Sequence, residues 1–335
     1  MEIKTGKKDW IKILREIFLK INLDKNLLEF LNRAKAPYNK ISILKSDASK
    51  RRYYRITNKE NNFLVMDSSL EKKSLSNFIK ISDWLKRSGY SVPNIFYKNT
   101  SKGFCLLEDF GNTKFSDLKN KNLKEQYNLT IKLLVSLAKN KPPEFLNDYS
   151  RLIFKKELKL FIDWYLFYNK KKYTAAISSW NEIWDSLFLQ ISKYNKNSIV
   201  LRDFHIDNLF WLQDRENLKK IGLIDFQDAL VGHPCYDLVS LLQDVRVNLS
   251  KNEQNRLYNL YIAEGFLDDK LFEETYFIYG TQRLIKIIGI FYRLNYLDKK
   301  SNYLKFLPRT WELLRINLNY PYLKHLSDWF KSYVF

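Results

Sequence analysis

The chain has few of the residues that cross-link a fold or build a metal cluster. Its 335 residues include two cysteines, Cys105 and Cys235, and three histidines, His205, His233 and His325. Two cysteines cannot form a disulfide framework, so a reducing, cytoplasmic compartment is expected. The three histidines are spread along the chain, which argues against a histidine-based metal site.

Long apolar runs are also missing. The sequence contains no continuous apolar stretch of about 18 residues, and its charged N-terminus lacks the apolar core of a signal peptide. We therefore expect a soluble protein with no membrane partner. Hydrophobic residues make up 45% of the chain and aromatic residues 16%, which is enough for a folded globule of one large domain or two lobes.

Acidic residues are too few to balance the basic ones. The chain has 37 Asp and Glu against 57 Lys and Arg, a formal net charge of +20. Such a charge can indicate nucleic acid, an anionic membrane surface or phosphate-bearing substrates. The lysines are spread out and no nucleic-acid-binding motif accompanies them, so compositional drift explains the charge better than a polyanion-binding face. No nucleic-acid partner is expected.

The apolar periodicity changes about one third of the way along the chain. Short strands are expected over residues 41–45, 52–57, 63–67, 94–98 and 103–109, with helices over 9–21 and 74–90. After Gly111, helices are expected over residues 116–140, 151–168, 175–194, 237–248, 251–263, 271–296, 303–318 and 322–333, interrupted by a hairpin of 208–212 and 220–225. The pattern predicts an α+β protein of two lobes, residues 1–110 and 111–335, with a ligand in the cleft between them.

The segment LRDFHIDNLFWL, residues 201–212, carries the strongest chemical signal. Asp203 and Asn208 precede the expected hairpin, and Asp225 ends its second strand. Phosphoryl transfer from ATP needs one carboxylate to accept the proton of the acceptor hydroxyl, and an amide and a second carboxylate to hold Mg²⁺. Protein kinases supply these groups in this order, with glycine where Gln227 stands here. Asp203 is therefore the predicted base, and Asn208 and Asp225 are the predicted metal ligands.

Single residues of this region also have simpler interpretations. Asp-x₄-Asn occurs often by chance, and an aspartate at a strand end usually caps a turn. Asp207 is best explained as such a cap. His205 could pack to fix the loop, and Asp237 could either cap a helix or support the catalytic loop. Both of these are structural supporting roles.

The chain resembles the aminoglycoside phosphotransferase/choline kinase superfamily. The resemblance lies in residues 201–212, the block around Asp225 and Asp237, SDASKRRYYRI (residues 46–56) and the block from Gly280 to Leu314. More narrowly, they resemble the bacterial anomeric kinases that phosphorylate N-acetylmuramate and N-acetylglucosamine at C1 during cell-wall recycling. The resemblance covers nearly the whole chain. It implies a two-lobed protein-kinase-like fold, with a small five-stranded N-lobe with helices and a larger, mainly helical C-lobe, that binds ATP and Mg²⁺ and acts on a small amino sugar.

The resemblance also implies how ATP is bound. Backbone groups of Glu108 and Phe110 would meet adenine, and residues 46–56 would form the loop over the phosphates. That loop has Ser46 where relatives usually carry glycine, so it lacks a glycine for close backbone approach.

The strand that ends in Val65-Met66-Asp67 has no lysine where typical kinases place one to pair with the phosphates. Arg52 and Arg55 are the candidates to replace it. The alternative for Arg51 and Arg52, at the start of the strand expected over residues 52–57, is a solvated strand edge.

The acceptor site is expected in the helical lobe. Asp244 follows the first helix after the catalytic segment. Gln282, Arg283 and Lys286 share one helical face, and Arg293 continues it. Arginine binds a carboxylate through two parallel hydrogen bonds, which would suit a carboxylate-bearing sugar. The alternative is a solvated polar stripe.

Two other functions remain open at this point. The chain could phosphorylate another hydroxyl acceptor, such as choline or an antibiotic, although a cationic acceptor calls for an acidic or aromatic cage and this chain is rich in Lys and Arg. It could also be a non-catalytic nucleotide- or nucleic-acid-binding protein on a kinase fold. The presence of Asp203, Asn208 and Asp225 together argues against that. The sequence does not determine the acceptor, its anomer or the oligomeric state.

Overall fold

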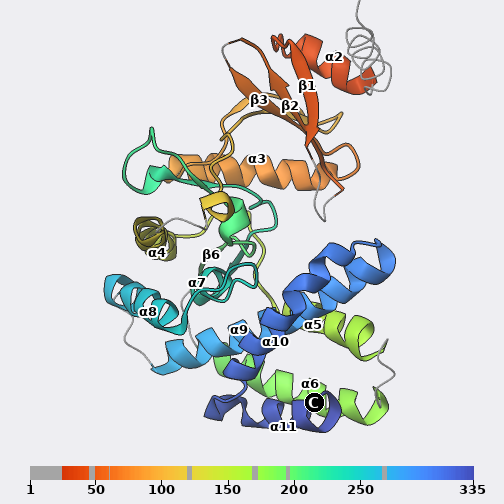
Figure 1. The fold of residues 1–335 in the computed structure, drawn as a ribbon, viewed down its shortest axis with the longest axis vertical. Helices are drawn as coiled ribbons and strands as arrows, with labels where there is room; N and C mark the ends of the chain where they lie inside the picture. The colour runs from red at the N-terminus through yellow and green to blue at the C-terminus, as the bar shows by residue number, and fades with distance from the viewer. Residues whose placement is uncertain are drawn as a thin grey trace, which may run out of the picture. The chain divides into compact units, whose positions relative to one another are not determined.

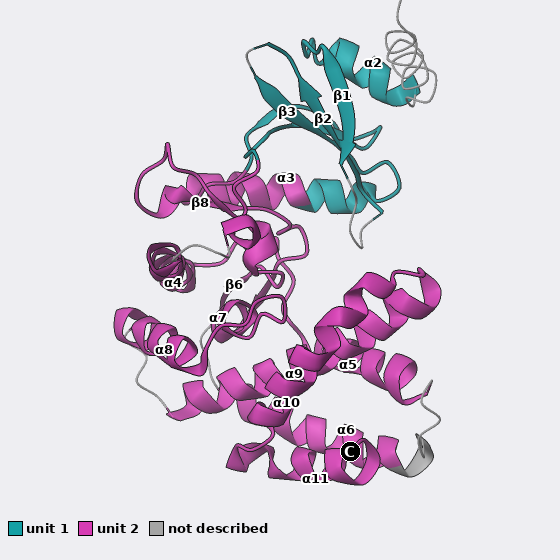
Figure 2. Ribbon diagram, in the orientation of Figure 1, with its two compact units in different colours: residues 1–77, 93–111 teal, residues 78–92, 112–335 magenta. Residues whose placement is uncertain are grey.

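A computed structural model describes residues 25–44, 50–59, 61–118, 123–167, 173–193, 197–265 and 270–335. The helix expected over residues 9–21 and Ser46 of the expected phosphate loop lie outside these residues. The chain divides into two compact units (Figure 2). Unit 1 comprises Met1–Asn77 and Pro93–Gly111, and unit 2 comprises Phe78–Val92 and Asn112–Phe335.

Unit 1 is built on a five-stranded antiparallel sheet with the order β1-β2-β3-β5-β4 (Figure 1). Its strands are β1 (Lys40–Leu44), β2 (Arg52–Thr57), β3 (Asn62–Asp67), β4 (Ile95–Asn99) and β5 (Phe104–Glu108). All five expected strands are confirmed, each to within one residue at either end. Strand prediction succeeded because each run is apolar and bounded by turn residues.

The sheet of unit 1 packs against α2 (Lys25–Arg33), a helix that the sequence pattern did not predict. Its buried side chains, Leu27, Phe30 and Leu31, join a core with apolar residues of β2, β3 and β5. Phe30 stacks on Phe104 with ring centroids 5.3 Å apart. A helix of nine residues is marginal alone, so this packing stabilises it.

Helix α3 (Lys72–Arg87) ends beside Gly89, which has the positive φ of 89° typical of a helix C-terminus. From Phe78 onward it belongs to unit 2. The Phe78 ring stacks on Phe226 at 5.0 Å, and the Ser91 carbonyl accepts the Leu223 N–H at 2.8 Å. The end of α3 and the chain after it therefore fix the segment around Asp225.

Unit 2 is mainly helical (Figure 1). Its described helices are α4 (Lys124–Lys139), α5 (Arg151–Phe161, continued by a π-helical turn over Ile162–Leu166), α6 (Tyr173–Ile191), α7 (Cys235–Leu242), α8 (Lys251–Gly265), α9 (Lys270–Leu297), α10 (Leu307–Asn317) and α11 (Lys324–Tyr333). The eight helices expected here are confirmed. None of the helices in the described part of the chain combines the length and apolar composition needed to cross a bilayer.

Three helix boundaries were predicted wrongly. Helix α10 begins at Leu307 and not at residue 303, because Ser301–Phe306 forms a 3₁₀ helix. Helix α4 begins at Lys124 and not at residue 116, because Phe115–Leu118 forms a separate 3₁₀ turn. Helix α7 ends at Leu242 and not at residue 248. There the Asp244 carboxylate accepts the backbone N–H of Arg246 at 3.0 Å, a local turn that competes with continuation of the helix.

Two short antiparallel strand pairs frame the predicted catalytic segment. The expected hairpin is confirmed as β7 (Leu209–Trp211) paired with β8 (Ile221–Leu223). A second pair, β6 (Ser198–Val200) with β9 (Leu230–Gly232), was not predicted from the sequence. Each strand has only three residues, too few for a clear periodic pattern. Because β6 leads into the segment with Asp203 and β9 follows Asp225, this pairing anchors both segments together.

Candidate active site

The loop between β6 and β7 is folded onto its own backbone around Asp203, which is half-buried. The Asp203 carbonyl accepts the His205 N–H at 3.2 Å and the Asn208 side-chain nitrogen at 2.9 Å. The Asn208 N–H in turn donates to the His205 carbonyl at 2.9 Å. These contacts close the loop and fix the two predicted functional residues relative to each other.

The hairpin register brings the two predicted metal ligands together. Leu209 pairs with Leu223, and the Ile224 N–H donates to the Asn208 carbonyl at 3.2 Å, so Asn208 lies beside the residue before Asp225. Asp225 has a left-handed φ of 60°, a strained conformation of the kind that clusters at functional sites.

These two residues fit a magnesium ion chemically. The Asn208 side-chain nitrogen is used within the loop, so its oxygen is the atom that a cation would take. An amide oxygen and a carboxylate are ligands that Mg²⁺ prefers. In the described part of the chain, no three His, Cys, Asp or Glu side chains form a metal cluster. The remaining ligands would therefore come from nucleotide phosphates and water.

Asp237 supports the catalytic loop from α7. It is buried, and its carboxylate accepts the backbone N–H groups of Leu201 at 2.7 Å and Arg202 at 2.9 Å. Burial raises the pKa of Asp237 to about 7, although the two N–H groups oppose the shift. Pro234 occupies the N-cap position of α7, so of the two roles considered for Asp237 the geometry matches loop support.

His205 is buried in the same loop. Burial lowers the pKa of His205 well below its usual range, and the nearby cations Arg246, Arg283 and Lys114 lower it further. The imidazole is therefore neutral near pH 7. Its Nε2 lies 3.4 Å from the Asn208 side-chain nitrogen, and its Nδ1 has no hydrogen-bond partner among the described residues.

Asp244, a predicted acceptor residue, is buried and bonded to the catalytic loop. One carboxylate oxygen accepts the Ile206 N–H at 3.2 Å, and the other accepts the Arg246 side chain at 3.2 Å. Arg246 also pairs with Asp207 at 2.9 Å. The Asp244 carboxylate therefore holds the loop from the side of α7.

The α9 side chains predicted to bind the acceptor are not a solvated stripe throughout. Gln282 and Arg283 are 0% and 4% exposed. The Gln282 side-chain nitrogen donates to Glu157 at 3.0 Å, and the Arg283 Nη1 is buried without a hydrogen-bond partner among the described residues. Arg293 lies further along α9 and is half-buried.

Glu157 of α5 is a buried carboxylate that the sequence reasoning missed. It forms ion pairs with Arg202 and with Lys286, the latter at 2.8 Å, and accepts hydrogen bonds from Gln282 and the Tyr149 hydroxyl. Burial alone would raise its pKa, but Lys286 and Arg202 outweigh this effect, and the pKa falls to about 2.

A sequence signal for Glu157 did exist. It lies on the buried face of α5 with Phe154, Leu158 and Phe161, at helical spacing. A carboxylate on an apolar helix face requires a buried partner. The sequence does not say which partner that is.

In unit 1, the two candidate phosphate-binding arginines lie on β2 and pair with carboxylates. Arg52 contacts Asp67 at 2.6 Å. Arg55 contacts Asp109 at 2.5 Å and donates to the Gly111 carbonyl at 3.2 Å. Arg55 is therefore attached to the segment directly after β5.

The predicted adenine-binding residues lie at the end of β5. The Glu108 N–H donates to the Asn94 carbonyl at 2.8 Å, and the Glu108 carboxylate accepts the Asn94 side chain at 2.8 Å. The Glu108 N–H is therefore already used within unit 1. Phe110 follows two residues later and is half-buried.

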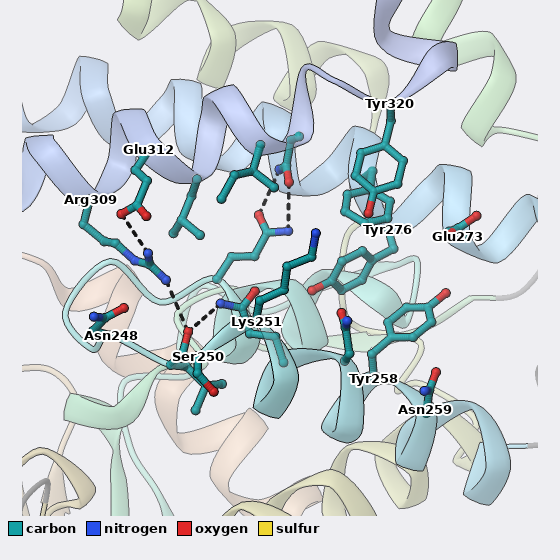
Figure 3. Close-up of a pocket in the computed structure, with 18 residues that line it drawn as sticks. Asn248, Ser250, Lys251, Tyr258, Asn259, Glu273, Tyr276, Arg309, Glu312 and Tyr320 are labelled. Carbon is teal, nitrogen blue, oxygen red and sulfur yellow. Dashed lines mark hydrogen bonds and ion pairs between the residues drawn. The ribbon is translucent and has the colours of Figure 1, made fainter.

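A cavity of about 570 Å³ lies among α8, α9, α10 and the loop after α7 (Figure 3). None of the predicted site residues lines it. Two buried polar side chains that line it, Gln243 and Asn317, already bond each other through two hydrogen bonds of 3.3 and 3.0 Å. Arg309 at its edge bonds Glu312 at 2.8 Å. We therefore do not assign the active site to this cavity.

The fold of the two units and the sequence order of Asp203, Asn208 and Asp225 are those expected of a kinase-like phosphotransferase. Residues 40–272 match the family model described as "Phosphotransferase enzyme family". The chain belongs to this family, and it is an ATP-dependent phosphotransferase.

Similar curated proteins include two bacterial enzymes named N-acetylmuramate/N-acetylglucosamine kinase. The one from Caulobacter vibrioides is 28% identical over 331 residues, which covers 87% of this chain and 91% of that protein. The one from Neisseria meningitidis serogroup B is 31% identical over 288 residues, which covers 81% of this chain and 83% of that protein.

Solved structures share the fold at lower identity. The choline kinase LicA from Streptococcus pneumoniae is 14% identical, with a TM-score of 0.63 over 87% of this chain and 98% of that one. The ADP-bound aminoglycoside phosphotransferase APH(2'')-Ib is 17% identical, with a TM-score of 0.60 over 87% of this chain and 97% of that one. The expected two-lobed protein-kinase-like fold class is thereby confirmed.

Proposed function

We propose that the protein phosphorylates the anomeric C1 hydroxyl of a free N-acetyl amino sugar of the N-acetylmuramate or N-acetylglucosamine type, with Mg-ATP as the phosphoryl donor. The observation that carries the proposal is the similarity to kinases of that name over 81% and 87% of the chain. A cytoplasmic location and a small-molecule partner fit this activity.

The predicted residues then have these roles. Asp203 accepts the proton of the C1 hydroxyl as its oxygen attacks the γ-phosphorus and ADP leaves. Asn208 and Asp225 hold Mg²⁺, which when bound neutralises charge on the phosphates. A hemiacetal hydroxyl is more acidic than an ordinary alcohol because the ring oxygen withdraws electrons. One carboxylate can therefore suffice as the base.

ATP would be held by residues of unit 1. The carbonyl of Glu108 and the backbone of Phe110 would meet adenine. Arg52 and Arg55 are the candidates for the phosphates, and their partners Asp67 and Asp109 would orient them.

The acceptor would be held by Gln282, Arg283 and Arg293 of α9, beside the loop that Asp244 supports. Arg283 is the best-supported member of this set. Its Nη1 is buried without a hydrogen-bond partner among the described residues, which is costly for a charged group, and an anionic group on the acceptor would lower that cost.

The test is ADP release from purified protein with Mg-ATP and a panel of acceptors: N-acetylglucosamine, N-acetylmuramate, methyl N-acetylglucosaminide, choline and an aminoglycoside. We expect turnover with the two free sugars and none with the methyl glycoside, whose C1 oxygen is blocked. Steady phosphorylation of the methyl glycoside would exclude the anomeric reaction. Faster turnover with choline or the aminoglycoside than with the sugars would show that the acceptor is not an amino sugar of this type.

The acceptor residues are tested in the same assay. Arg283→Ala and Arg293→Ala should raise the sugar KM more than the ATP KM, since loss of a charge-assisted contact costs about 1.5–3 kcal/mol. Unchanged sugar KM values in both variants would remove these arginines from the acceptor site.

A further inference from the structure

Arg202, the residue directly before Asp203, has an unusual backbone. Its φ is +71°, in the left-handed region that non-glycine residues rarely adopt. Such a conformation persists only where the surroundings impose it, and it is often found at functional sites.

The backbone of Arg202 is held on both sides by α7. Its N–H donates to Asp237 at 2.9 Å, and its carbonyl accepts the Ser240 hydroxyl at 3.3 Å. These bonds fix the peptide groups next to Asp203. They do not fix the loop that carries Asp225.

The side chain of Arg202 connects to the loop that carries Asp225. One guanidinium nitrogen, Nη1, donates to the carbonyl of Asp228 at 3.2 Å, three residues after Asp225. The other, Nη2, pairs with Glu157 of α5. Arg202 therefore links the loop of the predicted base to the loop of the predicted metal ligand, and the Glu157 carboxylate sets where the guanidinium lies.

Glu157 is itself rigidly held. It is 6% exposed and bonded to Lys286 and Gln282 of α9 and to Tyr149, in addition to Arg202. Lys286 and Gln282 hold this carboxylate even without the Tyr149 hydrogen bond, so it is a firm anchor for a guanidinium. An ion pair of this kind restricts both partners to a narrow range of positions.

We propose that Glu157 is a positioning residue of the phosphoryl-transfer site, which acts through Arg202 to fix Asp203 relative to Asp225. The inference rests on the proposed function only in that both aspartates act in the reaction. A small displacement between the base and the metal ligand lowers the rate of a positioned reaction without preventing substrate binding.

The test is a double-mutant cycle in kcat and KM with full-length protein, Mg-ATP and N-acetylglucosamine. Glu157→Gln and Arg202→Gln should each lower kcat about tenfold or more, with both KM values within about threefold of wild type. The double variant should be no slower than the slower single variant, because both changes break the same link. Should Glu157→Gln not fold, Glu157→Asp keeps the charge but shortens the side chain and takes its place in the cycle.

Tyr149→Phe is the matched control. It removes another hydrogen bond from the same carboxylate without touching Arg202, so its kcat should stay within about twofold of wild type. Multiplicative losses in the double variant, normal kcat in either single variant, or an equal loss in Tyr149→Phe would overturn the inference. Wild-type protein that is inactive on every acceptor would instead overturn the proposed function, so the two failures are distinguishable.

Discussion

Replacing Glu157 with glutamine should change how the stability of the protein depends on pH. The folded-state pKa of this carboxyl is about 2 against an ordinary 4.5, because Lys286 and Arg202 outweigh the effect of burial. A lowered pKa means that the unfolded chain binds the proton more tightly than the folded chain does. The stabilisation is therefore present above pH 4.5 and is lost as the pH falls towards 2.

The size of the effect follows from the two pKa values. Their difference corresponds to about 3 kcal/mol of folding free energy at pH 7. Of this, little should be lost at pH 5 and about 2 kcal/mol at pH 3. The carboxyl is 6% exposed, so solvent screens the interaction little. Glutamine cannot titrate, and it leaves the two cations without their charged partner, which should cost about 3–5 kcal/mol at pH 7.

The measurement is urea unfolding of wild type and Glu157→Gln at pH 7, 5 and 3, followed by circular dichroism. Because other carboxylates titrate equally in both proteins, only the difference between them matters. That difference should be largest at pH 7 and smaller by about 2 kcal/mol at pH 3. Tyr149→Phe keeps the titrating carboxylate and both of its cations, so it should retain most of the wild-type pH dependence and lose only the part due to the Tyr149 hydrogen bond. A difference that stays constant or widens on acidification would refute the electrostatic account of Glu157.

Three further predictions concern the catalytic loop and the packing of α9. Asp203→Asn should lower kcat by about 10²–10⁴ while leaving ATP affinity largely intact, and near-normal kcat would remove Asp203 from the role of base. Asp225→Ala should abolish turnover, and calorimetry should show that it loses the Mg²⁺ dependence of nucleotide binding; a dependence equal to that of wild type would contradict the metal assignment. Gly289→Ala should destabilise the fold by several kcal/mol, since its added Cβ would lie 2.4 Å from the Leu160 backbone carbon of α5; an unchanged melting temperature would contradict this close approach.

The arrangement of the proposed catalytic segment could be predicted in part because its geometry is local. Asp203, Asn208 and Asp225 lie within 23 residues, and a short hairpin is enough to bring the last two together. The strands of unit 1 were likewise predictable, because each is a short apolar run bounded by turns. The α2 helix was missed because nine residues form a helix only when the sheet packs against them.

The resemblance assigned acceptor-binding residues to α9, but it did not indicate how they are arranged. Gln282 and Arg283 were expected to face either a ligand or solvent, and both are buried. Gln282 bonds Glu157, whereas Arg283 keeps a buried nitrogen without a hydrogen-bond partner among the described residues. Helical spacing predicts that such residues share one face of the helix. It does not predict which charged side chains of other helices contact that face.

The sequence by itself determined the two-part pattern of strands and helices and, through the order of Asp203, Asn208 and Asp225, the class of phosphotransferase to which the chain belongs. Only the tertiary structure decided which groups hold those residues in place. Glu157 meets Arg202 across 45 positions and Lys286 across 129. The physical reason is that periodicity and turns depend on residues a few positions apart in the sequence. The partner of a buried charge depends instead on the packing of helices that are far apart in the sequence.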